Sequence, residues 1–294
     1  MPRRDVDGKT SMYALAGQHI NFSPIPMFFN AISNYIGYNS IMLPIDTQKN
    51  GIVKCLEAIK IINCAGGVIH SPHRCELNDF LTSVSEEALK CNAVNVVKID
   101  ETGFHGHNTE VSAFRKVFPV ITGDDLYGKK IFIFGSGGIS HSIAVACAEE
   151  QCASITIVNR THEKSQMLCD LINSNYGDIA FSASFEDSTT IHNFYNADVL
   201  IQATTVGMFP QIEENLIYNG YNLMPHHTVL EAIYNPPQTK FMRIAEEKGC
   251  KVFSLRDMMF FNCIQVFQWL TGVYIDKKNE KNLFNIWHDL IYNM

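Results

Sequence analysis

A glycine-rich turn at residues 135–140 is the part of the sequence whose residue types and spacing point most clearly to chemistry. It follows an apolar run at residues 131–134 and leads into a helical pattern at residues 140–150. In such a turn the first glycine permits the tight bend, the second admits a pyrophosphate, and the N–H groups of the helix start bind it. The strand–turn–helix context favours a dinucleotide site over a purely structural turn. The expected cofactor contacts are Gly135, Ser136, Gly137, Gly138 and Ile139.

The end of the next expected strand, residues 155–158, indicates which dinucleotide is bound. NAD-specific proteins place an acidic residue about 20 residues after the glycines, but this strand is followed by Asn159, Arg160 and Thr161. Arg160 can bind a 2′-phosphate by charge-assisted bonds, and its neighbours can donate further hydrogen bonds. The other interpretation is that Arg160 is a solvated cation at a helix start. We expect NADP rather than NAD, and therefore an oxidoreductase acting on a small molecule.

The bulk composition narrows the class of protein. The 294 residues are 46% hydrophobic and 18% charged, which predicts two folded domains rather than a disordered chain. A net charge of −7 argues against nucleic acid as a partner. The nine cysteines form no CxxC pair, the first ten residues are polar, and no apolar run is long enough to span a membrane. We expect a cytoplasmic protein with no membrane partner.

The elements that must position these residues alternate between strand and helix patterns. The first half is expected to form strands at residues 40–43, 67–69 and 95–99, a helix at 49–62, and turns at Gly103, Gly106 and Asn108. The second half is expected to form strands at residues 131–134, 155–158, 199–201 and 229–233, with helices between them. An apolar helix is expected from residue 256 to about 270, then a polar break at 277–280 and a last helix. The first half has the order of a βαβ unit, and in the second half a parallel sheet with crossover helices is the simplest arrangement.

The motifs of the second half, taken in order, resemble the shikimate dehydrogenase family, and the resemblance extends over nearly the whole chain. They are the glycine turn, the Asn-Arg-Thr triplet at 159–161, Ala-Thr-Thr-Val-Gly-Met at 203–208 and Tyr-Asn-Pro-Pro-Gln-Thr at 234–239. The resemblance implies that Thr204, Val206 and Met208 lie near the nicotinamide and ribose. It also implies that Tyr234 contacts the substrate carboxylate.

The resemblance implies an α/β fold with two domains. A doubly wound, Rossmann-like NADP-binding domain is expected at residues 113–255. A smaller α/β substrate-binding domain is expected from residues 1–112 with 256–294, and the ligands are expected in the cleft between the two. A small cyclic acid is the implied substrate, in aromatic amino acid biosynthesis, and the protein is expected to be a monomer or homodimer.

The substrate half departs from the family at several positions. The family's Ser-x-Ser-Pro segment is Asn21-Phe22-Ser23-Pro24 here, so one serine is retained. Asn95 matches a family asparagine, and Asn262 stands at the position of a family glutamine. By resemblance, the substrate-binding residues are Asn21, Ser23, Asn95, Tyr234 and Asn262.

The catalytic positions also differ. Arg74 replaces the family's catalytic lysine, His70 its threonine, Val68 its asparagine and Glu110 its aspartate. Arginine stays protonated at any ordinary pH and is a poor proton acceptor, although it binds anionic groups well. His70 titrates near neutrality in its reference state. We expect Glu110 or His70 to accept the proton of a substrate hydroxyl, and Arg74 to bind an anionic group of the substrate.

Two alternatives remain open at this point. The changed pocket is also compatible with a protein that binds a nucleotide or metabolite without turnover. A metal site is disfavoured, because the spacing lacks the usual zinc pattern; its ligands would be His70, His73, Cys75, His105 and His107. We expect no metal. The pair His226-His227 precedes an expected strand and is expected to be solvated.

Overall fold

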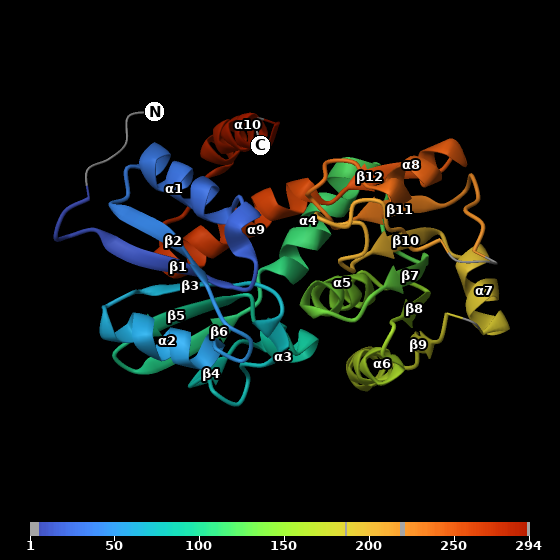
Figure 1. Ribbon diagram of the computed structural model, residues 1–294, viewed down its shortest axis with the longest axis horizontal. Coiled ribbons are helices and arrows are strands. Elements are labelled where there is room, and N and C mark those ends of the chain that lie inside the picture. The colour runs from blue at the N-terminus through green and yellow to red at the C-terminus, as the bar shows by residue number, and fades with distance from the viewer. Residues whose placement is uncertain (1–5, 186, 218–220, 293–294) are drawn as a thin grey trace. The chain divides into compact units, whose positions relative to one another are not determined.

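The chain forms two units, and each is built around its own six-stranded sheet (Figure 1). The computed structural model describes residues 6–185, 187–217 and 221–292. The first unit comprises Met1–Thr109 with Met259–Met294, and the second comprises Glu110–Met258. Glu110 therefore belongs to the second unit, although we expected it within the first domain. None of the helices in the described residues is long and apolar enough to cross a membrane.

The sheet of the first unit is mixed. Its strands are β1 (Ser11–Gly17), β2 (Ser40–Asp46), β3 (Gly66–Ile69), β4 (Ser83–Val84), β5 (Val96–Asp100) and β6 (Gly103–His107), in the order β2-β1-β3-β5-β6-β4. The expected βαβ unit is present, since β2 and β3 each pair with β1 in parallel. Strand β5 runs antiparallel to β3 and β6. Two residues connect β5 to β6, which is too short for a crossover helix and therefore requires a hairpin.

Gly106 lies inside strand β6, where we expected a turn. A Cβ atom on this residue would stand 2.5 Å from Leu81 Cδ1 and 3.1 Å from both γ carbons of Val94. The absence of a side chain thus permits close packing against the sheet, and no turn is needed to explain the glycine.

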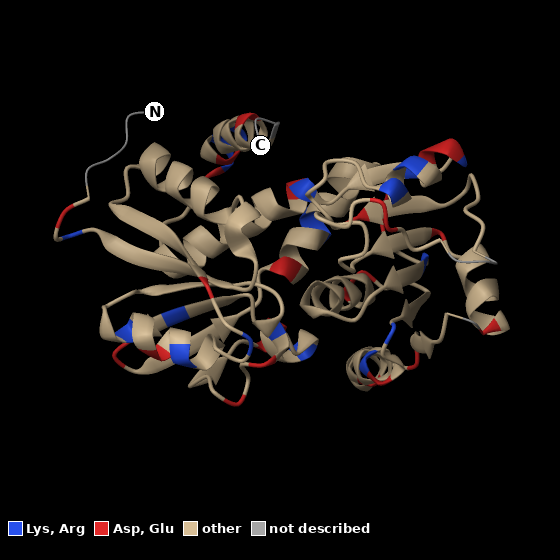
Figure 2. Cartoon of the chain, viewed as in Figure 1, with Lys and Arg blue, Asp and Glu red and all other residues tan. Residues whose placement is uncertain are grey.

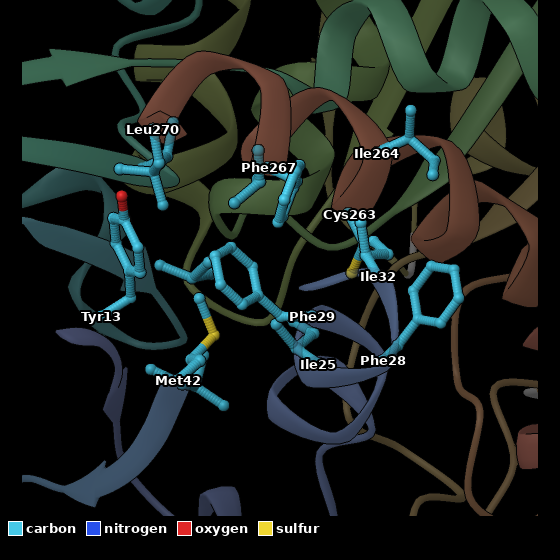
Figure 3. Close-up of a cluster of buried hydrophobic side chains, with 14 of the residues drawn as sticks. Tyr13, Ile25, Phe28, Phe29, Ile32, Met42, Cys263, Ile264, Phe267 and Leu270 are labelled. Carbon is cyan, nitrogen blue, oxygen red and sulfur yellow. The ribbon is translucent and has the colours of Figure 1, made fainter. Parts of the chain in front are cut away.

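Helices cover both faces of this sheet and complete two apolar cores. They are α1 (Ile25–Ile36), α2 (Ile52–Ile61), α3 (Glu86–Cys91), α9 (Arg256–Thr271) and α10 (Lys277–Tyr292), with short 3-10 helices η1 (Ile20–Phe22) and η2 (His73–Cys75). Figure 3 shows Phe29 of α1 beside Phe267 of α9, and the ring centroids of these two residues are 5.1 Å apart. Trp287 of α10 packs on Phe28. The C-terminal helices therefore belong to the core of the first unit.

The polar break that we expected at residues 277–280 is the first turn of α10. The carboxylate of Asp276 accepts a hydrogen bond from the Asn279 backbone N–H at 2.8 Å, so it satisfies a donor at the helix start. The polar residues thus begin a helix whose later turns carry its apolar contacts.

The sheet of the second unit is parallel throughout. Its strands are β7 (Lys130–Phe134), β8 (Ser154–Val158), β9 (Ala180–Ala183), β10 (Val199–Gln202), β11 (Thr228–Glu231) and β12 (Lys251–Ser254), in the order β12-β11-β10-β7-β8-β9. The connecting helices are α4 (Glu110–Thr122), α5 (Gly138–Glu149), α6 (His162–Tyr176), α7 (Ser188–Tyr195) and α8 (Lys240–Glu247). The strand order reverses between β7 and β10, which is the doubly wound arrangement and confirms the predicted fold class. Such sheets bind ligands at the carboxyl ends of the strands beside this reversal.

Candidate active site

The turn between β7 and α5 has the shape of a pyrophosphate cradle. Gly135 has a φ of 104°, and a Cβ atom there would meet the Ala203 carbonyl oxygen at 3.0 Å, so only glycine fits. Gly137 is exposed, and a Cβ built on it would meet nothing within 4 Å, so space for a ligand lies beside it. Ser136 is buried, and its hydroxyl has no hydrogen-bond partner among the described residues. Backbone N–H groups and this hydroxyl at the start of a 12-residue helix fit a dinucleotide phosphate.

The other residues of the turn are less accessible. Gly138 and Ile139 are half-buried in the first turn of α5, and Ser140 is fully buried. A small residue at position 140 agrees with close packing of the helix against the sheet.

The end of β8 presents polar and cationic groups without a carboxylate. Arg160 and Thr161 are exposed, and Thr161 precedes α6 without a side-chain hydrogen bond to the helix. The Asn159 side chain donates to the Thr161 carbonyl at 2.9 Å, so one of its amide hydrogens holds the turn. Arg160 and Thr161 are thus the groups best placed to bind a 2′-phosphate.

Two loops follow β10 and β11 and carry the remaining predicted contacts of the second unit. Thr204, Val206 and Met208 are half-buried, and the Thr204 hydroxyl accepts from the Val206 backbone N–H at 3.0 Å. Tyr234 is also half-buried, and its carbonyl accepts from the Arg256 guanidinium at 3.2 Å. The structure therefore fixes both loops internally.

Glu110 is the first residue of α4, and its side chain is almost completely buried. Its Oε2 accepts a hydrogen bond from the Ser142 hydroxyl of α5 at 3.2 Å. Ser142 could not be predicted as a site residue, because its contact with Glu110 depends on the packing of α4 against α5.

In the first unit, Asn95 and Asn262 come together with a residue that we had not predicted, Thr109. The Asn95 amide donates to Thr109 Oγ1 and to Asn262 Oδ1, each at 2.9 Å, and its oxygen accepts from the Thr109 backbone N–H at 2.9 Å. The Thr109 hydroxyl is 2.6 Å from Asn262 Oδ1. All three are buried. Both amide hydrogens of Asn95 are therefore donated to protein groups. Asn262 takes part in this network only as an acceptor through Oδ1, and its NH2 group donates to neither Asn95 nor Thr109.

His70 and Arg74 lie close together at the end of β3. The Arg74 Nε donates to the Ile69 carbonyl at 3.1 Å, which fixes the stem of the guanidinium. Burial, and then the positive charge of Arg74, lower the pKa of His70 to about 4. The His70 Nδ1 atom has no hydrogen-bond partner among the described residues. His70 is thus neutral at physiological pH, and it does not titrate near neutrality as we expected.

Asn21 and Ser23 lie at the start of α1. Asn21 is exposed in η1, and Ser23 is half-buried with its hydroxyl 3.4 Å from the Ile25 backbone N–H, which donates to it. Neither side chain has a contact that would prevent it from binding a ligand.

Three of the four histidines considered as metal ligands, His73, His105 and His107, have other partners. His73 is fully buried between the Thr47 hydroxyl, at 3.0 Å, and the Glu76 carboxylate, at 2.9 Å. His105 and His107 contact the hydroxyls of Ser83 and Ser85, respectively, at 2.7 Å. Within the described residues, no group of three or more His, Cys, Asp or Glu side chains is arranged to hold a metal ion.

Charged residues of both signs are interspersed along the described part of each unit, as Figure 2 shows.

The predicted site residues form two sets. The cofactor residues, Tyr234 and Glu110 belong to the second unit, and the other predicted substrate residues belong to the first. The structure joins Asn95 to Asn262 and His70 to Arg74, as described above.

Comparisons with known proteins cover both units. Residues 15–97 match the family model "Shikimate dehydrogenase substrate binding domain", and residues 119–257 match "Shikimate / quinate 5-dehydrogenase". The shikimate dehydrogenase (NADP(+)) of Alkaliphilus metalliredigens strain QYMF is 30% identical over 91% of this chain and 93% of its own length.

Solved structures give the same result. A shikimate dehydrogenase in complex with NADP+ is 25% identical, with a TM-score of 0.83 over 96% of this chain and 97% of that chain. A ligand-free 5-ketofructose reductase of Gluconobacter sp. strain CHM43 is also 25% identical, with a TM-score of 0.76 over 95% of this chain and 100% of that chain. The resemblance seen in the sequence is confirmed, and the chain belongs to the shikimate dehydrogenase family.

Proposed function

We propose that this protein is an NADP-dependent oxidoreductase that transfers a hydride between the nicotinamide and a small cyclic hydroxy or keto acid. The observation that carries the proposal is the pair of anion-binding features in the second unit. The cradle at Gly135–Gly138 suits a pyrophosphate, and the exposed Arg160 at the end of β8 suits a 2′-phosphate. The NADP named for the relatives agrees with this assignment.

The residues of the second unit would hold NADP in the following way. The N–H groups at the start of α5 and the Ser136 hydroxyl bind the pyrophosphate, and Arg160 with Thr161 binds the 2′-phosphate. Thr204, Val206 and Met208 contact the nicotinamide and ribose. When bound, the cofactor supplies the hydride acceptor or donor.

We assign the proton transfer to Glu110. Arg74 stays protonated, and a proton on His70 would add a second positive charge beside Arg74, which is disfavoured because burial and the charge of Arg74 lower the pKa of His70 to about 4. A carboxylate becomes neutral when it accepts a proton, so we propose that in the oxidation Glu110 takes the proton from the substrate hydroxyl. Arg74 binds an anionic substrate group, and the neutral His70 offers a hydrogen bond. Asn21, Ser23, Tyr234 and the Asn262 NH2 group complete the proposed substrate contacts.

We propose two candidate substrates, in the order in which they should be tested. Shikimate, with 3-dehydroshikimate as its oxidised form, is the first pair to test, because the relatives are named shikimate dehydrogenases. Val68 stands where the family has an asparagine, and both Asn95 amide hydrogens are used internally. These two features reduce the number of groups that can bind substrate hydroxyls, so a less hydroxylated cyclic acid is the second candidate.

The direct test mixes purified protein with NADP+ and a panel of cyclic hydroxy acids, and follows the absorbance of the reduced cofactor. We expect turnover of at least one acid, with NAD+ a poorer acceptor than NADP+. Calorimetry with NADP+ is run in parallel. Binding of NADP+ without turnover of any acid would favour the non-enzymatic alternative, and failure to bind NADP+ would contradict the whole proposal.

Arg160 offers a separate prediction about cofactor preference. Replacing Arg160 with alanine is expected to raise the Kd for NADP+ about ten- to hundredfold, because a hydrogen bond to a charged group contributes roughly 1.5–3 kcal/mol. The Kd for NAD+ should stay unchanged. Lys248→Ala is the matched control, since it removes an exposed cation of the second unit at the end of α8, away from the residues proposed to bind the cofactor. Equal losses of NADP+ and NAD+ affinity in the Arg160 variant would show that Arg160 does not bind the 2′-phosphate.

A further inference from the structure

Two buried polar side chains end the neighbouring strands β10 and β11. Gln202 and Glu231 are register partners in the parallel sheet, and both have an exposed fraction of 0%. Neither residue is among the site residues predicted from the sequence. Polar side chains at such positions have to be hydrogen bonded, and their partners show what they hold in place.

Gln202 holds the loop that follows β10. Its Oε1 accepts from the Thr204 backbone N–H at 2.8 Å, and its Nε2 donates to the Val206 carbonyl at 2.9 Å. The side chain therefore fixes Thr204 and Val206, two of the three residues of this loop that we propose as neighbours of the nicotinamide and ribose.

Glu231 holds the loop that follows β11 at both ends. Its Oε1 accepts from the Ile233 backbone N–H at 3.0 Å, and its Oε2 accepts from the Thr239 hydroxyl at 2.7 Å. The same hydroxyl accepts from the Met242 backbone N–H at 3.2 Å and caps α8. One carboxyl group thus connects the strand end, the loop containing Tyr234 and the next helix.

The two loops are also bonded to each other. The Phe209 backbone N–H donates to the Asn235 carbonyl at 3.1 Å, and the Ala232 N–H donates to the Gln202 carbonyl at 3.0 Å. Gly207 has a φ of 89°, and a Cβ atom there would stand 3.0 Å from the Glu214 carbonyl oxygen. The backbone at this point is therefore close-packed, so a shift in one loop is transmitted to the other.

We propose that Gln202 and Glu231 are positioning residues that hold residues 203–209 and 232–239 as one preformed surface for the cofactor and substrate. Neither side chain needs to touch a ligand for this role. The inference rests on the proposed function, which assigns ligand contacts to these loops. Its structural part concerns the loops of the free protein and can be measured separately.

The test compares Glu231→Ala with Glu231→Gln. Burial raises the pKa of Glu231 to about 8. Glutamine has the same shape, keeps an oxygen that can accept from the Ile233 N–H, and carries an NH2 group that can donate to the Thr239 hydroxyl, as the neutral carboxyl group would. The control is Glu247→Ala, which removes an exposed carboxylate from α8. Each variant is checked for cooperative thermal unfolding. Thr239→Val, which removes the hydroxyl's bond to Glu231 together with its cap on the Met242 N–H, replaces the alanine variant if that one does not fold.

In Glu231→Ala we expect faster amide exchange at residues 203–209 and 232–239 in the free protein. We also expect a rise in KM for NADP+ or a fall in kcat of about ten- to hundredfold, since a misplacement of about 1 Å costs that much. Glu231→Gln should restore both readouts to within about threefold of the parent, and Glu247→Ala should match the parent.

Two outcomes separate the inference from the proposed function. Unchanged loop exchange in Glu231→Ala, with NADP+ affinity equal to the parent's, overturns the inference whether or not the parent is active. A parent protein that neither binds NADP+ nor turns over an acid contradicts the proposed function, and amide exchange of the loops then still decides whether Glu231 positions them.

Discussion

Glu110→Gln is expected to lower kcat for the oxidation of the hydroxy acid by about two to four orders of magnitude, which is the usual effect of removing a general base. Glutamine has the same shape, and its amide oxygen can still accept from the Ser142 hydroxyl. It cannot accept a proton from a substrate hydroxyl. The Kd for NADP+, measured by calorimetry, should stay at the parent value, because Glu110 has no proposed cofactor contact.

Two further variants make the Glu110 prediction specific. Ser142→Ala removes the hydrogen bond to the carboxylate but keeps the carboxylate, so we expect kcat to fall by no more than about tenfold. His70→Asn removes the competing base, and a similarly small effect is expected because the pKa of His70, at about 4, makes it a weak acceptor. If kcat survives in Glu110→Gln and is lost in His70→Asn, the proton acceptor is His70 and our assignment is wrong.

The glycine turn could be predicted from the sequence because its cause is local. Gly135 needs a positive φ, and the strand and helix on either side are recognisable from a few residues each. The same holds for the alternation of strands and helices in the second unit. In the first unit the βαβ pattern was recognisable, but the β5–β6 hairpin was not predicted, because Gly103 and Gly106 resemble turn residues when taken one at a time.

The polar interior could not be predicted in the same way. Asn95 and Asn262 are 167 residues apart in the chain, and Thr109 joins them only because the residue before β5, the segment after β6 and α9 meet within the first unit. Gln202 and Glu231 are similar cases, since a polar residue at a strand end has no sequence pattern that distinguishes burial from exposure. The family resemblance identified Asn95 as a ligand contact, but only the structure shows that its amide hydrogens are already bonded.

His227 was expected to be solvated, and the structure places it in the core of the second unit instead. Its exposed fraction is 0%, and its ring packs edge-on against Phe194 with centroids 5.3 Å apart. Its Nδ1 accepts from the Met224 backbone N–H at 3.2 Å, so the proton of the neutral ring is on Nε2. A second proton would remove this acceptor, and burial together with His226 lowers the pKa of His227 to about 4.

These contacts predict acid sensitivity of folding. Between pH 6.5 and about 4 the unfolded chain binds a proton at His227 that the folded chain does not bind. The contribution of His227 to stability is therefore complete above pH 6.5 and is lost as the pH falls towards 4. His70 acts in the same direction, and Glu231, with its pKa raised to about 8, acts in the opposite direction by losing stability as the pH rises from 4.5 to 8.

Because these groups overlap, the expected result for His227 is a difference between variants. His227→Asn keeps an acceptor near the Nδ1 position and removes the titration. Between about pH 7.5 and about pH 5, its free energy of unfolding should fall by about 1–2 kcal/mol less than that of the parent. Denaturant unfolding at the two pH values measures this difference. His192→Asn, which changes an exposed histidine of α7, should follow the parent. If His227→Asn and the parent lose equal amounts of unfolding free energy between the two pH values, then the folded protein binds a proton at His227 as readily as the unfolded chain does, and the prediction is wrong.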